Sequence, residues 1–263
     1  MLELIDLGFR YSGRDWVFRH TNLTIASGSI TSILGPNGKG KTTLLRCIAG
    51  LNTAQEGRVV RDSNIGYVPQ ATSSSFAFSV FDMVLMGRAK KVSTFGVPSK
   101  ADVAQTRTVL ERVGIDHLAT SNFTELSGGQ RQLVLIARAL NTDCTFMILD
   151  EPVSALDLRN QAHVLQLLRE LASEGMGILL TTHHPDHPLH LGGDAVVMFS
   201  PEEIVVGPVA TLVTGETLSR LYGIDVATDT VHDRGNPRTV VYTRYDNFAA
   251  AGNDLRLTES SLT

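Results

Sequence analysis

The chain has 263 residues, of which 43% are hydrophobic and 19% are charged, and its formal net charge is −4. These values are ordinary for a globular protein and exclude an overall basic field of the kind that attracts nucleic acids or anionic lipid surfaces. A chain of this length can form one large α/β domain with an inserted subdomain, or two small domains.

The cysteines and the hydropathy pattern indicate the cellular compartment in which the protein is expected. Cys47 and Cys144 lie inside apolar segments, which favours packed thiols in a reducing compartment. No apolar run approaches the roughly 20 residues of a membrane-spanning helix. The first six residues alternate as in a strand and lack the basic region of a signal peptide. We therefore expect a soluble intracellular protein whose membrane role, if it has one, depends on a partner.

Residues 1 to about 34 have the pattern of short β segments, with turns expected at Gly8, at Ser12-Gly13 and at Ser27-Gly28. Tyr11 lies in this region. An aromatic ring on such a sheet can stack on a purine, although strand tyrosines are more often simply packed. The sequence leaves both possibilities open.

A glycine-rich loop follows the strand predicted over residues 30–34 and precedes a predicted helix. The loop matches the pattern G-x-x-x-x-G-K-[ST], and its flanks give that pattern the context of a phosphate-binding loop. Glycines let successive N–H groups point at an anion, and the helix directs its positive end to the same place. Lys41 would reach the β- and γ-phosphates, and the Thr42 hydroxyl is a suitable Mg²⁺ ligand. The candidate nucleotide-binding residues here are Gly35, Asn37, Gly38, Lys39, Gly40, Lys41, Thr42 and Thr43.

Two more strands are predicted over residues 58–60 and 65–68, and the second leads to Gln70. The Gln70 amide can contact a metal, a water or a phosphate, or it can be an ordinary turn residue. Residues 71 to about 137 then lack strand signals and contain predicted helices over 79–88, capped by Ser79 and ending near Gly87, and over 101–113. We therefore predict an inserted helical lobe.

The next helix begins with an unusual cap. Ser127 and Gln130 match the capping box S-x-x-[EQ], and apolar residues then repeat at helical spacing. Gly128 and Gly129 leave the helix N-terminus bare, although glycine there destabilises the helix start by a few tenths of a kcal/mol or more. The pair therefore suggests a close approach by another group, such as an anion.

Residues 146–149 form a continuous apolar run typical of a strand that is covered on both faces, and Asp150 and Glu151 follow it. The carboxyl end of a buried parallel strand is where open α/β sheets bind ligands. Alternation sends the two side chains in different directions. Asp150 can therefore hold Mg²⁺, directly or through water, while Glu151 polarises an attacking water.

A turn over residues 154–157 leads to a predicted helix over 158–172, and a strand over 177–182 ends at His183. His183 can hydrogen-bond a γ-phosphate or the attacking water. His184, His187 and His190 suggest a metal site, but two prolines spoil the helical spacing and no cysteine or close carboxylate cluster completes one. We expect these three to be surface residues.

The chain ends with a predicted hairpin over residues 195–207, a helix over 212–222, and short strands with polar turns from about 227. The tail over 253–263 is expected to be frayed. No internal repeat is found.

These motifs in this order resemble the ATPase subunit of an ABC transporter, over about residues 1 to 225. The resemblance rests on the Walker A loop, the Q-loop Gln70, the signature beginning Leu126-Ser127-Gly128-Gly129-Gln130, the Walker B acids, the D-loop from Ser154 to Asp157 and the switch His183. It implies a P-loop NTPase (RecA-like) fold of the α/β class, with a mostly parallel sheet core, an N-terminal antiparallel β subdomain and an inserted α-helical subdomain over about 71–137. The ABC ATPase domain would cover residues 1–226, followed by an extension over 227–263.

The resemblance also implies a Mg²⁺-dependent ATPase with assigned site residues. Tyr11 would stack on adenine, Thr42 and Gln70 would bind Mg²⁺ together with Asp150, Glu151 would be the general base, and His183 would contact the γ-phosphate. Two copies would pack head to tail, so that each ATP lies between the Lys41 loop of one copy and the signature and D-loop of the other. The residues implied on that second side are Ser127, Gly128, Gly129, Gln130 and Asp157.

A finer resemblance, over residues 65–70 and 79–88, is to ATPases of importers for metal chelates, namely iron siderophores, haem, vitamin B12, and molybdate or tungstate. The stretch from 73 to 95 is most similar to the molybdate and tungstate type. The implied partners are two permease subunits contacted by about residues 71–95, and indirectly a substrate-binding protein, at the cytoplasmic face of a bacterial inner membrane. No nucleic-acid partner is expected. Lys39, Val153 and His184 depart from the family pattern, and none of these departures removes a catalytic group.

Two other classes of protein fit the sequence less well. A cytosolic ABC ATPase acting on DNA is disfavoured because the interval between Gly35 and Ser127 lacks sustained heptads, and the ribosome-type proteins carry two cassettes where this chain has one. A binding module without turnover is disfavoured by the presence of both Glu151 and His183.

Overall fold

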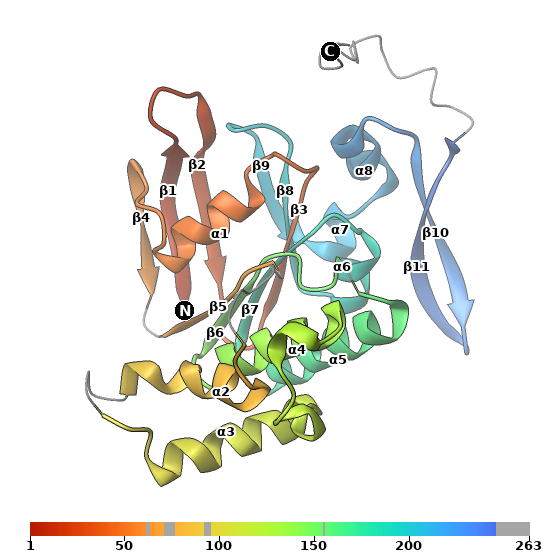
Figure 1. The fold of residues 1–263 in the computed structure, drawn as a ribbon. Coiled ribbons are helices and arrows are strands. Elements are labelled where there is room, and N and C mark those ends of the chain that lie inside the picture. The colour runs from red at the N-terminus through yellow and green to blue at the C-terminus, as the bar shows by residue number, and fades with distance from the viewer. Residues whose placement is uncertain (62–63, 71–76, 92–95, 155, 246–263) are drawn as a thin grey trace, which may run out of the picture.

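The computed structural model describes residues 1–61, 64–70, 77–91, 96–154 and 156–245. Figure 1 shows a small sheet at the N-terminal side, a larger central sheet, a lobe of helices below it, and a hairpin at the C-terminal side. Among the described residues no helix is both long and apolar enough to cross a bilayer.

The N-terminal sheet is antiparallel, as predicted. It consists of β1 (Leu2–Arg10), β2 (Trp16–Ile25) and β4 (Glu56–Arg61) in the order β2-β1-β4. The turn expected at Gly8 is wrong. Gly8 lies inside β1, where the register with both neighbouring strands shifts. A register shift of this kind bends a strand without ending it.

The central sheet confirms the predicted fold class. It contains β5 (Ile65–Val68), β6 (Phe146–Leu149), β7 (Gly177–Thr182), β3 (Ile30–Leu34), β8 (Asp194–Met198) and β9 (Ile204–Pro208) in that order. The first five strands are parallel, and β9 pairs antiparallel with β8. Every residue of β3, β6 and β7 is buried. This two-sided burial explains why these strands appear in the sequence as continuous apolar runs.

Helix α1 (Lys41–Ala49) fills the space between the two sheets. Leu44, Leu45 and Ile48 are fully buried in one cluster with residues from both sheets. Full burial of such a side chain contributes about 1.5–3 kcal/mol. The packing therefore fixes where α1 starts relative to β3, and with it the shape of the loop between them.

The helical lobe contains α2 (Val80–Leu85), the 3₁₀ segment η1 (Met86–Lys91), α3 (Lys100–Val113), the short 3₁₀ turns η2 (Asp116–Leu118) and η3 (Phe123–Glu125), and α4 (Gly128–Leu140). Between 77 and 137, no strand occurs in the part of the lobe that the structure describes. Ser79 caps α2 as predicted, but the chain continues as η1 beyond Gly87. The predicted permease-contacting segment falls partly on 71–76 and 92–95, outside the described residues.

The C-terminal third contains α5 (Leu158–Ser173), α6 (Asp186–Leu191), α7 (Val209–Leu212), α8 (Gly215–Tyr222), and a hairpin of β10 (Val226–Asp233) and β11 (Asn236–Thr243). The helix predicted over 212–222 is present as α8, but it begins three residues later, at Gly215. Thr214 accepts a hydrogen bond from the Thr217 N–H and starts a new helix, α8. The tail expected to be frayed lies outside the described residues.

The histidine-rich segment also differs from expectation. It forms the short helix α6, and His187 on it is only 7% exposed, so the prediction of a surface residue is wrong. Pro185 occupies the N-cap position, where a proline removes no helical hydrogen bond. Across the described part of the chain, no cluster of three or more metal-binding side chains occurs.

Candidate nucleotide site

The loop between β3 and α1 has a backbone that requires glycine. Gly40, the N-cap of α1, has a φ of 93°, and a Cβ there would lie 2.4 Å from Cγ1 of Val17. Both the left-handed conformation and the close contact exclude a side chain. The chain can therefore turn directly from the loop into α1, whose free N–H groups face the loop.

Lys41 lies at the centre of this site and is only 6% exposed. Its Nζ donates to the carbonyl oxygens of Gly35 at 2.6 Å and Pro36 at 3.1 Å, and it is 3.7 Å from Oε1 of Glu151. Burial lowers the pKa of Lys41, while Glu151 and Asp150 oppose that shift. A buried cation held by two carbonyls and a carboxylate is ready to exchange these contacts for a phosphate.

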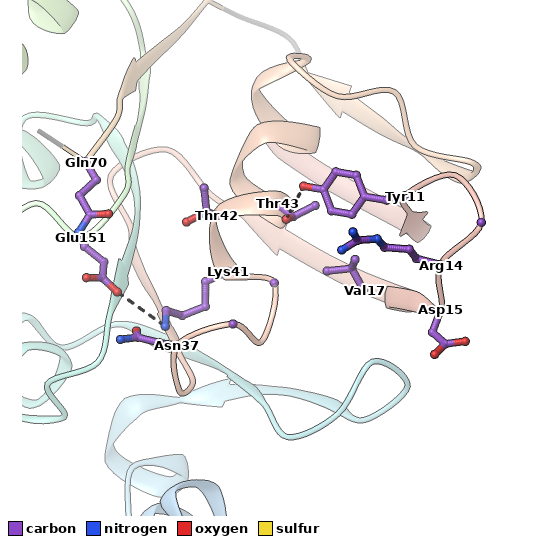
Figure 2. Close-up of a pocket in the computed structure, with 13 residues that line it drawn as sticks. Tyr11, Arg14, Asp15, Val17, Asn37, Lys41, Thr42, Thr43, Gln70 and Glu151 are labelled. Atoms are coloured by element: carbon purple, nitrogen blue, oxygen red, sulfur yellow. Dashed lines mark hydrogen bonds and ion pairs between the residues drawn. The ribbon is translucent and has the colours of Figure 1, made fainter. Parts of the chain in front are cut away.

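The loop opens into a cavity of about 840 Å³ (Figure 2). The Tyr11 hydroxyl is 3.2 Å from Oγ1 of Thr43, and the Tyr11 ring meets Phe9 edge to face. Tyr11 is nevertheless 44% exposed, so part of its ring remains free at the outer end of the cavity, opposite Glu151. The lining residues are Tyr11, Gly13, Arg14, Asp15, Val17, Asn37, Gly38, Gly40, Lys41, Thr42, Thr43, Gln70 and Glu151.

The two acids after β6 have different environments, as the alternation of the strand predicts. Asp150 is 3% exposed and does not line the cavity, whereas Glu151 does. Thr181 on β7 connects them, because its hydroxyl donates to Oδ1 of Asp150 at 2.8 Å and accepts from the Glu151 N–H at 2.8 Å. Glu151 has a φ of 46°, a strained value for a residue with a side chain. Thr181 therefore holds Glu151 in this conformation.

His183 follows β7 and approaches the same acid. Its Nδ1 lies 3.3 Å from Oε2 of Glu151 without the alignment of a hydrogen bond, and this nitrogen is buried without another partner among the described residues. The backbone of His183 is fixed from α8, because the Tyr222 hydroxyl donates to the His183 carbonyl at 3.1 Å. Sequence analysis did not identify Thr181 or Tyr222, since neither belongs to a local motif.

The signature segment lies elsewhere in the chain. Ser127 and Gln130 form the predicted capping box, with reciprocal hydrogen bonds of 3.3 and 3.0 Å. A Cβ on Gly129 would lie 2.8 Å from Nδ2 of Asn160, so packing of α4 against α5 explains that glycine. Gly128 is exposed. Asp157 caps α5 through the Asn160 N–H at 2.8 Å.

The cavity brings together nine of the predicted residues, namely Tyr11, Asn37, Gly38, Gly40, Lys41, Thr42, Thr43, Gln70 and Glu151. Nine others do not line it: Gly35, Lys39, Asp150, His183, Ser127, Gly128, Gly129, Gln130 and Asp157. Gly35 and His183 still contact the lining residues Lys41 and Glu151, and Asp150 is connected to Glu151 through the Thr181 hydroxyl. Four residues that line the cavity were not predicted as site residues, namely Gly13, Arg14, Asp15 and Val17.

A parallel sheet whose central strand leads through a glycine loop into a helix, with acids at the end of a neighbouring strand, defines a P-loop nucleoside triphosphatase. The family model described as "ABC transporter" matches residues 18–154. The chain belongs to the ABC transporter family and is an ATP-binding, ATP-hydrolysing member of it.

Three similar proteins illustrate this membership. The molybdate import ATP-binding protein MolC of Haemophilus influenzae is 40% identical over 222 residues, which cover 84% of this chain and 87% of that protein. A solved structure of an inward-facing metal-chelate type ABC transporter has a TM-score of 0.89 and 37% identity, covering 94% of this chain and 98% of that one. A dimeric bacterial ABC transporter cassette has a TM-score of 0.68 and 25% identity, covering 80% and 99%.

Proposed function

We propose that this chain hydrolyses ATP to power the uptake of a metal chelate or of an oxyanion such as molybdate through a membrane permease. The similarity to a molybdate import protein and to a metal-chelate type transporter supports these two cargo classes. A permease that contacts about residues 71–95 would place this subunit at the cytoplasmic face of a bacterial inner membrane. A separate binding protein would select the cargo.

The convergence of Lys41, Glu151 and His183 is the observation that carries the hydrolytic part of the proposal. The two carboxylate oxygens of Glu151 face Lys41 and His183 at 3.7 and 3.3 Å. A γ-phosphate bound by Lys41 would therefore have Glu151 beside it to accept a proton from the attacking water. His183 would orient the phosphate or that water, and Tyr11 would stack on adenine at the other end of the cavity.

The residues at the phosphate end are suitable for Mg²⁺. Thr42 and Gln70 line one cavity with Glu151, and Asp150, the residue before Glu151, has one oxygen, Oδ1, held by Thr181. Hydroxyl, amide and carboxylate oxygens are the ligands that Mg²⁺ prefers. A bound Mg²⁺ would neutralise charge that develops between the β- and γ-phosphates.

We further propose that the active unit is a homodimer. Ser127, Gly128 and Gly129 do not line the cavity of their own chain, and the exposed Gly128 lies at the bare start of α4. A head-to-tail pair would bring this helix start onto the nucleotide bound by the other copy. The dimeric state of a related cassette supports this arrangement.

The decisive experiment replaces Glu151 by Gln and measures ATP binding and phosphate release. We expect binding to remain and hydrolysis to fall by about 10²-fold or more, because the amide cannot accept a proton. Glu202→Gln, an exposed acid outside the cavity, serves as the matched control and should behave as the parent. Hydrolysis at the parent rate in the Glu151 variant would contradict the assignment of the base.

The cargo is tested separately. Cells that carry the chain with its permease and binding protein are given labelled molybdate or a labelled ferric chelate. Uptake of one of these, lost in the Glu151→Gln variant, supports the import function. Intact ATP hydrolysis without ATP-dependent uptake of either would instead indicate an ABC ATPase that is not tied to these cargoes.

A further inference from the structure

A second cavity, of about 940 Å³, lies between α5, α6 and β11, separate from the nucleotide cavity. Figure 1 shows the β10–β11 hairpin standing beside these helices, and α6 packs against β11. The cavity is lined by Leu158, Gln161, Ala162, Leu165, Gln166, Arg169, Glu170, Ser173, His184, Asp186, His187, His190 and Arg238. None of these residues has a role in the hydrolytic site described above.

One corner of the cavity is cationic. Arg169 on α5 and Arg238 on β11 both act on His190 of α6, whose pKa is lowered by burial and then by these two positive charges. Within the described chain, Arg169 has no ion pair, and Arg238 has only a 3.9 Å contact with Asp233 in which both side chains are 59% exposed. Two arginines from different elements therefore face one region without a close counter-charge.

The two acids that line the cavity interact with other groups. Glu170 accepts a hydrogen bond from Nε2 of Gln166 at 2.9 Å. Burial, followed by the charge of His183, lowers the pKa of His184, and Asp186 opposes that shift. Among the described residues neither acid forms an ion pair with Arg169 or Arg238. The acids therefore leave the cationic corner uncompensated.

His187 adds a largely buried imidazole at the wall of the cavity. Its Nδ1 lies 2.9 Å from Oγ1 of Thr182, which also donates to the His184 carbonyl at 3.4 Å and accepts from the His184 N–H at 3.1 Å. These contacts hold the ring in place beside the two arginines that line the same cavity.

We propose that this cavity binds a small tetrahedral oxyanion, of the phosphate, sulfate or molybdate type, between Arg169 and Arg238, beside the imidazole of His187. Guanidinium groups match the oxygen geometry of such anions, and their hydrogen bonds to an anion are about twice as strong as neutral ones. A bound anion would join the hairpin to α5 and α6. It would thereby connect the C-terminal extension to the segment that begins at His183.

The test uses the full chain saturated with Mg²⁺ and ADP, so that the phosphate loop is occupied, and titrates sulfate by calorimetry at constant ionic strength. We expect saturable binding that Arg169→Gln and Arg238→Gln each weaken about tenfold. Arg234→Gln is the matched control, because Arg234 is an exposed arginine of the same hairpin outside the cavity. Its dissociation constant should equal that of the parent.

Retained ADP affinity in each variant verifies that the protein is folded and that the nucleotide site is intact. Equal sulfate affinities in all four proteins, or no saturable binding in the parent, would mean an adventitious ion only and would overturn the proposal. Parallel titrations with phosphate and molybdate then identify the source. Tighter binding of phosphate indicates the product of hydrolysis, and tighter binding of molybdate indicates an imported anion. The result does not depend on the proposed import function.

Discussion

The fully buried hydroxyl of Thr181 connects the two acids of the site, Asp150 and Glu151. Its removal therefore tests how the fold positions these acids. Replacement by valine keeps the shape but removes a donor to Asp150 and an acceptor for the Glu151 N–H. A hydrogen bond to a charged group contributes about 1.5–3 kcal/mol and a neutral one about 1 kcal/mol. We therefore expect Thr181→Val to lower the free energy of unfolding by about 2.5 to 4 kcal/mol.

The same substitution should reduce kcat. Thr181 holds the Glu151 backbone at a positive φ, and the proposed base, Glu151, would lose much of its effect if it moved by about 1 Å. We expect kcat to fall by at least about tenfold, with ATP affinity changed by less than about threefold. Urea denaturation and a phosphate-release assay measure the two effects.

Thr31 on the adjacent strand β3 is a matched control. It is 1% exposed, and its hydroxyl has no hydrogen-bond partner among the described residues. Removal of an unpaired buried hydroxyl relieves a desolvation cost, so Thr31→Val should leave stability unchanged or raise it. If the Thr31 and Thr181 variants lost equal stability, the contribution of the two hydrogen bonds would be refuted.

Two further predictions concern the segment after β7. Burial raises the pKa of the Tyr222 phenol to about 12, so this group stays a hydrogen-bond donor to the His183 carbonyl. Tyr222→Phe removes that hydrogen bond, and kcat should fall about fivefold at constant KM. The control Tyr242→Phe should change neither kcat nor KM, and an equal loss of kcat in this control would contradict the positioning role of Tyr222. Burial, followed by the charges of neighbouring histidines, lowers the pKa of His187 to about 4. Between about pH 6.5 and 4, His187 is therefore protonated in the unfolded chain and neutral in the folded chain. The free energy of unfolding should fall as the pH is lowered across that window, with His187 contributing at most about 1.4 kcal/mol per pH unit. His187→Gln should make the free energy of unfolding less dependent on pH, whereas the exposed control His232→Gln should not.

Local patterns were sufficient to predict the phosphate loop, the capping box at Ser127 and Gln130, and the buried strand before Asp150. Each depends on residues that are adjacent in the chain, so their chemistry and spacing are visible in the sequence. The burial of the central strands was also predictable, because continuous apolar runs between helices favour a parallel sheet with both faces covered. The expected turn at Gly8 failed because a glycine can mark a bulge as well as a strand end.

What the sequence could not determine depends on contacts between distant segments. Thr181 holds Glu151 across two parallel strands, and Tyr222 reaches His183 from a helix 39 positions further along. The buried state of His187 follows from the packing of α6, which no periodic pattern indicated. A glycine loop carries its function in its own backbone, so its sequence alone identifies it. The orientation of a catalytic carboxylate is set by whichever side chains the fold places beside it, and only the tertiary structure decides which these are.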